Sequence, residues 1–369
     1  MLQRPPAEPG MSEADIDTPA LVIDLDAMER NLDRMAAFCR NAGVRLRAHA
    51  KTHKSPVIAH WQISRGAVGQ CVQKTAEAEV LAWGGVSDVL VSNEVVSPRK
   101  LARLAALSSM SNISLCADSA AVVDQIDAVA ESLATRLTVL VEVDVSGGRC
   151  GVEPGEPAAA LAARIARSRH LVFGGLQSYH GRAQHMRTEQ ERHDAIRQAA
   201  ARTMDTVAAI RKQKLECAIV GGAGTGTFAH EAASGVYNEL QAGSYVFMDA
   251  DYARNRPAPD FEQSLFVLST VMSAARHGIA VLDCGHKGIA IDSGLPLIHA
   301  RQDIDYAGAS DEHGSLILRS GPGSLATGET LRLVPGHCDP TVDRYDWYVG
   351  MRGKRVECVF PVAARGMMQ

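Results

Sequence analysis

Long apolar runs are absent from this 369-residue sequence. Nowhere do about 18 apolar residues follow one another, as a membrane-spanning helix would require. The first twenty residues, MLQRPPAEPGMSEADIDTPA, also lack the apolar core of a secretory signal peptide. We therefore expect a soluble protein that has no membrane as its partner.

Paired cysteines are missing as well. The chain has eight cysteines, at positions 39, 71, 116, 150, 217, 284, 338 and 358. None of them forms a CxxC pair, and their spacing is not that of a small disulfide-rich domain. Scattered cysteines of this kind are typical of free thiols in a reducing compartment, so we expect a cytoplasmic protein.

An excess of basic charge is the third missing feature. The 38 lysines and arginines face 42 aspartates and glutamates, which gives a formal net charge of −4. This balance predicts no nucleic-acid partner, because such partners require a cationic surface. A hydrophobic content of 46% is ample for a sizeable core, in one large domain or in two.

Short β-branched runs alternate with amphipathic segments between about residues 44 and 250. Eight strands are predicted, at 44–50, 67–72, 88–92, 113–117, 137–144, 171–177, 217–221 and 240–247. The segments between them show helical periodicity, as in 73–84, 97–110 and 118–134. Eight β/α units favour a closed (β/α)8 barrel of the TIM type over an open sheet.

The pattern changes on both sides of this region. Before it, residues 19–35 predict one strand followed by one helix. After residue 260, strands separated by Gly, Asp and Pro turns are predicted at 264–275, 279–285, 315–320, 330–337 and 347–362. We therefore predict an α/β fold with a barrel at 25–258, followed by a mostly β domain made of 1–24 and 259–369.

Two glycine-rich segments lie where a barrel of this kind often binds phosphate, after its seventh and eighth strands. They are VGGAGTGT at 220–227 and QAGSYVFMD at 241–249. Glycines let backbone amides approach phosphate oxygens closely, and the hydroxyls of Thr225 and Ser244 add hydrogen bonds. The spacing lacks the GxGxxG form of a dinucleotide site, and a simple flexible turn is the alternative to a phosphate site.

The segment RAHAKTHKSP, residues 47–56, puts Lys51 at the end of the first predicted barrel strand. Lys51 is either an ordinary surface cation or an amine whose pKa is lowered by neighbouring cations until it forms a Schiff base. A phosphate site and such a lysine at one barrel mouth together indicate pyridoxal 5'-phosphate. We expect the neighbouring cations to be Arg47, His49, His53, Lys54 and Arg149.

A second group of polar residues is found in PGHCDPT, residues 335–341. In an extended segment, His337 and Asp339 project to one face and Cys338 points away. An imidazole and a carboxylate suit a divalent ion such as Mn²⁺ or Mg²⁺. The alternative is a turn that an Asx hydrogen bond to Thr341 stabilises.

Seven segments spread over nearly the whole chain carry a family resemblance. They are DTPALVIDLDAMERN, RAHAKTHKSP, GLQSYHG, GGAGTGT, QAGSYVFMD, DCGHKG and VPGHCDPTVDRYD. Together they resemble the fold-type III pyridoxal-phosphate enzymes, within them the D-threonine aldolase, 3-hydroxy-D-aspartate aldolase and D-serine dehydratase group. The resemblance implies an alanine-racemase-like N-terminal barrel and a β domain that carries a metal site.

The resemblance also implies roles for single residues. Lys51 would bond covalently to the cofactor, Arg149 would lie near the pyridine ring, and Gln73 would flank it. Tyr179 would lie near the ring nitrogen or the substrate, although a tyrosine that closes a strand is often a core residue. The cofactor phosphate would be held by Thr225, Gly226, Ser244 and Tyr245.

The implied reaction involves the second group of residues. His185 matches the position of the base that removes the proton of the substrate hydroxyl, and a merely exposed histidine is the alternative. The dehydratase branch resembles His-x-Cys at the metal site, whereas His337 and Asp339 follow the His-x-Asp pattern of the aldolases.

The resemblance therefore implies a homodimeric, metal-dependent aldolase that cleaves a β-hydroxy-D-amino acid by a retro-aldol reaction. The substrate would be 3-hydroxy-D-aspartate, giving glycine and glyoxylate, or D-threonine, giving glycine and acetaldehyde. A D-serine or 3-hydroxyaspartate dehydratase is the first alternative, and an amino-acid racemase that needs no metal is the second.

Overall fold

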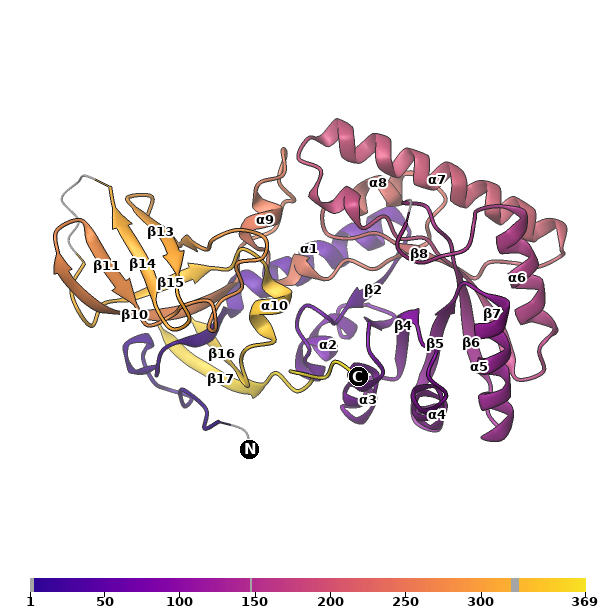
Figure 1. The fold of residues 1–369 in the computed structure, drawn as a ribbon, viewed down its shortest axis with the longest axis horizontal. Helices are drawn as coiled ribbons and strands as arrows, with labels where there is room; N and C mark the ends of the chain where they lie inside the picture. Colours follow the sequence, from indigo (N-terminus) through magenta and orange to yellow (C-terminus); the bar gives the residue numbers. More distant parts are fainter. Residues whose placement is uncertain (1–2, 147, 320–324) are drawn as a thin grey trace.

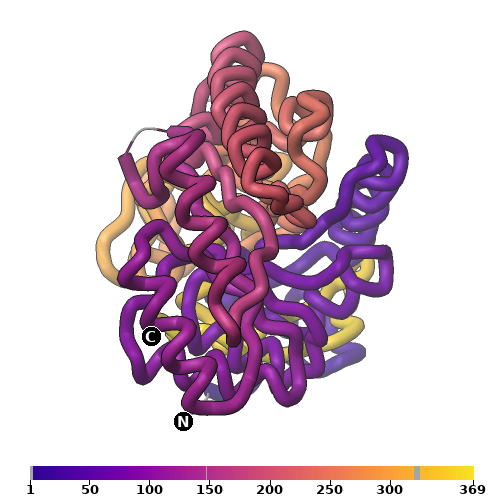
Figure 2. The backbone as a smooth tube through the Cα atoms, turned by 90° about the vertical axis from the view of Figure 1, so that its right-hand side faces the viewer, coloured from indigo at the N-terminus to yellow at the C-terminus, as the bar shows by residue number. Residues whose placement is uncertain are grey.

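The computed structural model describes residues 3–146, 148–319 and 325–369. It has two parts, a barrel surrounded by helices and a β-rich part beside it (Figure 1). Figure 2 views the molecule from the barrel side and shows the β-rich part lying behind the helices. Within the described residues, no helix is both long and apolar enough to cross a membrane.

In the described chain, eight parallel strands close into a barrel in sequential order, from β2 to β9. The strands are mostly buried, as expected for a parallel sheet whose outer face is covered by helices. The barrel strands are β2 (Arg45–His49), β3 (Gly69–Val72), β4 (Asp88–Glu94), β5 (Asn112–Ala117), β6 (Leu137–Glu142), β7 (Leu171–Gln177), β8 (Ile219–Gly222) and β9 (Glu239–Leu240). The predicted (β/α)8 barrel is confirmed.

Helices follow most of the barrel strands on the outside, and α1 precedes the first of these strands. Proline occupies an early position in several of them, where its missing N–H costs no hydrogen bond, as at Pro56 and Pro98. The helices are α1 (Leu25–Ala42), α2 (Pro56–Ile63), α3 (Thr75–Trp83), α4 (Pro98–Leu107), α5 (Ala120–Ser132), α6 (Glu156–Arg167), α7 (Glu189–Lys212), α8 (Phe228–Ala233) and α9 (Ala250–Ala253). Two short 3-10 helices, η2 (Arg182–His185) and η3 (Ser244–Val246), lie in the connecting loops.

The predicted eighth barrel strand, 240–247, is wrong in its length. Only Glu239 and Leu240 are extended as β9, and the chain then bends into η3. A Cβ atom at Gly243 would lie 2.7 Å from the carbonyl oxygen of His49, so the backbone passes very close to the loop after β2. The residues that follow are apolar because they are buried between the two parts of the molecule, not because they belong to a strand.

The β-rich part is built around one sheet. Among the described residues nine strands form it, and β1 (Ala20–Asp24) pairs in parallel with β16 and antiparallel with β10. A strand from before the barrel thus lies inside the sheet that follows it. The other strands are β10 (Leu265–Arg276), β11 (Ile279–Leu282), β12 (Leu297–Ile298), β13 (Ile304–Ala309), β14 (Gly314–Leu318), β15 (Thr330–Val334), β16 (Trp347–Arg352) and β17 (Arg355–Pro361).

The predicted mostly β C-terminal region is confirmed, while the predicted domain limits stay a prediction. The predicted strand 315–320 corresponds to β14, and Ser320 lies outside the described residues. Two short helical turns complete this part, η1 (Glu13–Asp15) and α10 (Cys338–Val342).

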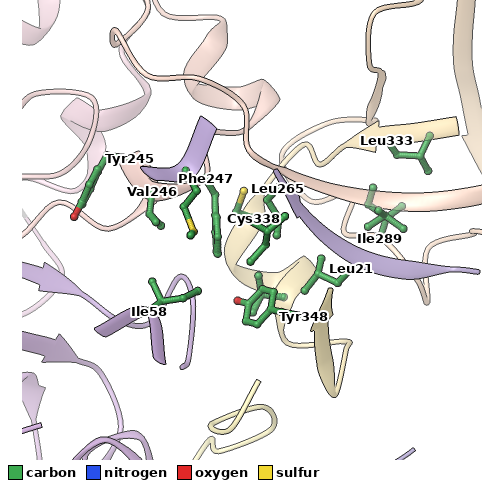
Figure 3. Close-up of a cluster of buried hydrophobic side chains, with 14 of the residues drawn as sticks. Leu21, Ile58, Tyr245, Val246, Phe247, Leu265, Ile289, Leu333, Cys338 and Tyr348 are labelled. Carbon is green, nitrogen blue, oxygen red and sulfur yellow. The ribbon is translucent and has the colours of Figure 1, made fainter. Parts of the chain in front are cut away.

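One apolar cluster joins the barrel to the sheet (Figure 3). Leu21 and Tyr348 from the sheet lie in it with Tyr245 and Phe247 from the end of the barrel, and all four are at most 1% exposed. Burial of each such side chain contributes roughly 1.5 to 3 kcal/mol. Cys338, the first residue of α10, lies in the same cluster, so this packing holds α10 against the barrel mouth.

Candidate active site

A cavity of about 370 Å³ opens at the carboxyl ends of the barrel strands. The loops after β2, β3, β6, β7, β8 and β9 all contribute to its wall, which is where barrel enzymes carry their reactive groups. Seven residues of the predicted site line it: Lys51, Gln73, Arg149, Tyr179, His185, Thr225 and Ser244. The structure therefore brings together side chains that are nearly 200 residues apart in the chain.

The Lys51 ammonium group forms an ion pair with Asp339 of α10. Burial is the largest single influence and would lower the pKa of Lys51, but Asp339, together with Tyr179 and Glu77, raises the pKa above its ordinary value. The Lys51 side chain is 41% exposed because it lines the open cavity. Lys51 follows β2 by two residues and does not end the strand itself.

The prediction that neighbouring cations lower the pKa of Lys51 is wrong. Arg47 lies inside the barrel, where its Nε is 2.7 Å from a Glu239 oxygen. The Lys54 Nζ atom lies 2.9 Å from Glu77, which neutralises it. Burial keeps two further groups uncharged, since it lowers the pKa of His49 to about 3 and that of His53 to about 4.

The glycine-rich loop after β8 offers donors at one end of the cavity. Thr225 is 1% exposed, and its hydroxyl has no hydrogen-bond partner among the described residues. A buried hydroxyl without a partner is costly unless a ligand meets it. Ser244 begins η3 on the neighbouring loop and lines the same wall. These observations fit a phosphate group bound at this end.

Gly226 and Tyr245 lie behind this wall rather than on it. The Gly226 amide donates to the side-chain oxygen of Gln184 at 3.0 Å. The Tyr245 ring is buried in the apolar cluster, and its hydroxyl accepts a hydrogen bond of 3.1 Å from Gln62. The Tyr245 side chain thus lies in the apolar cluster and does not line the cavity, and the phosphate roles of both residues stay predictions. Figure 3 shows Tyr245 in this cluster.

Arg149 lies over the ring of Tyr179, with its guanidinium carbon 5.5 Å from the ring centroid. One of its nitrogens is 3.5 Å from Glu142, a buried carboxylate at the end of β6. Burial, and then the neighbouring Glu94 at the end of β4, raises the pKa of Glu142 to about 8. Our sequence analysis missed both glutamates, although an acidic residue at the carboxyl end of a barrel strand is a recognisable signal.

Gln73 joins a polar network in the wall of the cavity. Its amide group lies 3.0 Å from the Nε2 atom of His49 and 3.1 Å from the carbonyl oxygen of Ser92. The Nδ1 atom of His49 accepts the backbone N–H of Lys51 at 3.3 Å. A neutral His49 therefore helps to fix the loop that carries Lys51.

His185 is the last residue of the 3-10 helix η2. Its side chain lines the cavity and is 54% exposed, and its Nδ1 atom lies 2.6 Å from an Asp251 oxygen. The imidazole ring also stacks on Tyr252 at a centroid distance of 6.0 Å. The second ring nitrogen, Nε2, is left to act toward the cavity.

The prediction of an extended segment at His337 and Asp339 is wrong. His337 is the residue before α10, and Asp339 is the second residue of that helix. The helix begins here because Asp249 accepts the backbone N–H of Cys338 at 3.2 Å, and Pro340 suits a first helical turn. One Asp339 oxygen pairs with Lys51 and the other has no hydrogen-bond partner among the described residues, so the alternative Asx bond to Thr341 is not made.

His337 and Asp339 line a second cavity of about 400 Å³, which also includes Lys51. The Nδ1 atom of His337 lies 2.8 Å from an Asp292 oxygen, which leaves Nε2 as a possible metal ligand. One oxygen of Asp339 is buried without a hydrogen-bond partner among the described residues. This donor pair fits a divalent ion.

A complete protein cage for a metal is not found. The described residues contain no group of three or more His, Cys, Asp or Glu side chains that could hold an ion. A divalent ion that keeps several waters or substrate oxygens as ligands fits such a two-ligand site better than a structural zinc, which takes four protein ligands.

Comparison with protein families identifies the chain. Residues 23–251 match the family described as alanine racemase, N-terminal domain, and residues 264–351 match "Putative serine dehydratase domain". The chain belongs to the alanine racemase N-terminal domain family, whose fold-type III members depend on pyridoxal phosphate. The family resemblance drawn from the seven segments is therefore confirmed.

Three relatives show the similarity in detail. The 3-hydroxy-D-aspartate aldolase of Paracoccus denitrificans (strain Pd 1222) is 44% identical over 98% of this chain and 95% of its own. The D-threonine aldolase of Arthrobacter sp. is 44% identical over 98% of this chain and 96% of its own. The crystal structure of D-threonine aldolase from Filomicrobium marinum is 47% identical, covers 100% of both chains and superimposes with a TM-score of 0.98.

Proposed function

We propose that this protein is an aldolase that cleaves a β-hydroxy-D-amino acid with the help of pyridoxal phosphate and a divalent metal ion. One observation carries the proposal: Lys51 of the barrel meets Asp339 of α10 at the cavity. A lysine suited to bind the cofactor and a carboxylate suited to bind a metal therefore serve one reacting centre. The two aldolase relatives support the same activity.

Some residues of the site would hold the cofactor and the metal ion, and others would react with the substrate. Pyridoxal phosphate, when bound, spreads the negative charge that develops at Cα into its ring. Lys51 would hold it covalently, the loops of Thr225 and Ser244 would bind its phosphate, and Arg149 would lie on the side of its ring. His337 and Asp339 would hold the metal ion, which would polarise the hydroxyl of the substrate.

His185 carries the proton transfer that starts bond cleavage. Its Nε2 atom accepts the proton of the β-hydroxyl, and the oxygen then forms a carbonyl as the Cα–Cβ bond breaks. The β fragment leaves as an aldehyde or as glyoxylate. The electron pair of the broken bond stays on Cα, which takes up a proton, and the Cα fragment leaves as glycine. Tyr179 faces the same cavity and is the second candidate for contact with the substrate.

Other properties belong to the same proposal. We infer a homodimer that uses Mn²⁺ or Mg²⁺ and works in the cytoplasm on a small-molecule substrate. All eight cysteines are free, which supports a reducing compartment. We also propose a barrel domain at 25–258 and a β domain made of 1–24 and 259–369. The pairing of β1 within the C-terminal sheet supports the assignment of the first residues to the β domain.

A direct product assay tests the activity. Purified protein is incubated with pyridoxal phosphate, Mn²⁺ and a panel of D-threonine, 3-hydroxy-D-aspartate and D-serine. Glycine together with acetaldehyde or glyoxylate is the expected result, and the better substrate of the first two identifies the native class.

Two results would overturn the proposal. Ammonia and a keto acid in place of glycine would make the protein a dehydratase. Inversion at Cα that persists after exhaustive chelation would make it a racemase.

A further inference from the structure

We propose that Asp251 is a positioning residue for His185, and that two arginines hold Asp251 in place for this task. In this arrangement Asp251 keeps the proton of the imidazole on Nδ1 and turns the unprotonated Nε2 toward the cavity. The inference rests on the proposed function, in which Nε2 accepts the proton of the substrate hydroxyl.

The contact joins two distant segments of the chain. His185 ends η2 after β7, whereas Asp251 lies in α9, which follows the last barrel strand. The Nδ1 atom of His185 and the Oδ2 atom of Asp251 are 2.6 Å apart. Asp251 is only 6% exposed and does not line the cavity, so it acts on the substrate only through His185.

The two oxygens of Asp251 have separate partners. Oδ1 accepts hydrogen bonds of 2.6 Å from Arg187 and of 2.6 Å from Arg254, while Oδ2 faces His185. Burial would raise the pKa of Asp251, but these partners together lower it to about 2. Asp251 therefore stays ionised near neutral pH. An ionised carboxylate only accepts hydrogen bonds, so the Nδ1 atom facing it must carry a proton.

The surrounding contacts fix the ring as well as its proton. Arg187 also donates to the side-chain oxygen of Asn255 at 2.8 Å. Asn255 in turn donates to the carbonyl oxygen of Gln184, the residue before His185, at 3.1 Å. These hydrogen bonds join η2 to α9 and to the residue Asn255 that follows it. Tyr252 stacks on the imidazole at an interplanar angle of 27°, which limits its rotation.

Asp251→Asn tests the inference with almost no change in shape. The side-chain oxygen of asparagine can still accept hydrogen bonds from Arg187 and Arg254. The asparagine NH₂ group then faces Nδ1 of His185 and favours the opposite tautomer of the imidazole. We expect kcat to fall roughly 10²- to 10⁴-fold, the usual range for the loss of a general base. KM and the affinity for pyridoxal phosphate should change little, because Asp251 does not line the cavity.

A spectroscopic measurement reads the tautomer without any turnover. In protein labelled with ¹⁵N-histidine, the neutral form of His185 should show a protonated Nδ1 and an unprotonated Nε2. Asp251→Asn should exchange these two signals. Asp194→Asn is the matched control, since Asp194 lies 3.6 Å from Nδ1 of the exposed His193, outside the cavity, and should leave both tautomer and rate unchanged.

The outcomes separate the inference from the proposed function. The double variant with His185→Ala should be no slower than His185→Ala alone, and a further loss would show that Asp251 acts on the fold instead. A neutral His185 that carries its proton on Nε2 in the unaltered protein would overturn the inference even if no variant folds. An enzyme that cleaves nothing in the substrate panel would overturn the proposed function, while the tautomer would still test the positioning.

Discussion

Glu94 and Glu142 form a pair of carboxyl groups behind Arg149 at the mouth of the barrel. They end β4 and β6, the Glu142 side chain is 5% exposed, and neither Glu94 oxygen has a hydrogen-bond partner among the described residues. Burial, and then the neighbouring Glu94, disfavours the charged form of Glu142. Replacing Glu94 with glutamine removes one charge and keeps the shape, so we use Glu94→Gln as the perturbation.

The structure determines the size and the sign of the effect. Burial first, and Glu94 second, raise the pKa of Glu142 from 4.5 to about 8, a difference of 3.5. At 1.36 kcal/mol for each pKa unit this is about 5 kcal/mol. The folded state holds this proton more tightly than the unfolded state. The contribution of Glu142 to stability is therefore complete below pH 4.5 and is lost as the pH rises through about 8.

Glu94→Gln should reduce this loss without abolishing it, because burial remains. Between pH 5 and pH 9, we expect the free energy of unfolding of the variant to fall by about 1 to 2 kcal/mol less than that of the unaltered protein. Urea unfolding followed by circular dichroism at the two pH values measures the difference. Glu153→Gln, an exposed glutamate on the loop of Arg149, is the control and should leave the pH dependence unchanged. An equal loss in Glu94→Gln would refute the coupling of the two carboxyl groups.

Three further predictions concern the cofactor and metal sites. Lys51→Ala should abolish the visible absorbance of covalently bound pyridoxal phosphate and leave the fold intact, and persistence of that absorbance would assign the bond to another lysine. Gly226→Val should weaken cofactor binding, measured by titration, because a Cβ there would lie 2.7 Å from the carbonyl oxygen of Gln184; an unchanged affinity would make the loop a simple turn. Chelation should stop cleavage and leave the cofactor bound, and Mn²⁺ should restore the unaltered enzyme but not Asp339→Ala; full activity after exhaustive chelation would remove the metal from the reaction.

The barrel could be predicted from sequence because its strands are short, β-branched and regularly separated by helical periodicity. Lys51, Thr225 and Ser244 could be placed on its mouth because the loops after parallel strands meet at one end. The length of the eighth strand could not be predicted. Its apolar residues, such as Phe247, face the C-terminal sheet, and periodicity alone does not tell burial in a strand from burial between domains.

Long-range charge pairing explains the other differences. The cations near Lys51 looked free in sequence because their partners, such as Glu239 for Arg47, are far away in the chain. Asp251 escaped notice for the same reason, since it lies 66 residues from His185. The spacing of residues within a motif gives no information on such partners, so neighbours in sequence do not predict the pKa of a side chain. The position of a strand does predict which loops meet at the barrel mouth.

The ion pair of Lys51 and Asp339 changes how the metal variants must be interpreted. Asp339→Ala would remove a metal ligand and also the carboxylate that pairs with Lys51 and helps to raise its pKa. Chelation of the unaltered enzyme removes only the metal. His337→Ala removes only a metal ligand, since His337 pairs with Asp292 and not with the lysine. A loss of cleavage that chelation, His337→Ala and Asp339→Ala share would report the contribution of the metal ion. A weaker bond to the cofactor in Asp339→Ala alone would report the contribution of the ion pair. The β-rich part thus belongs to the reacting centre through Asp339, and the barrel alone would lack both functions of that residue.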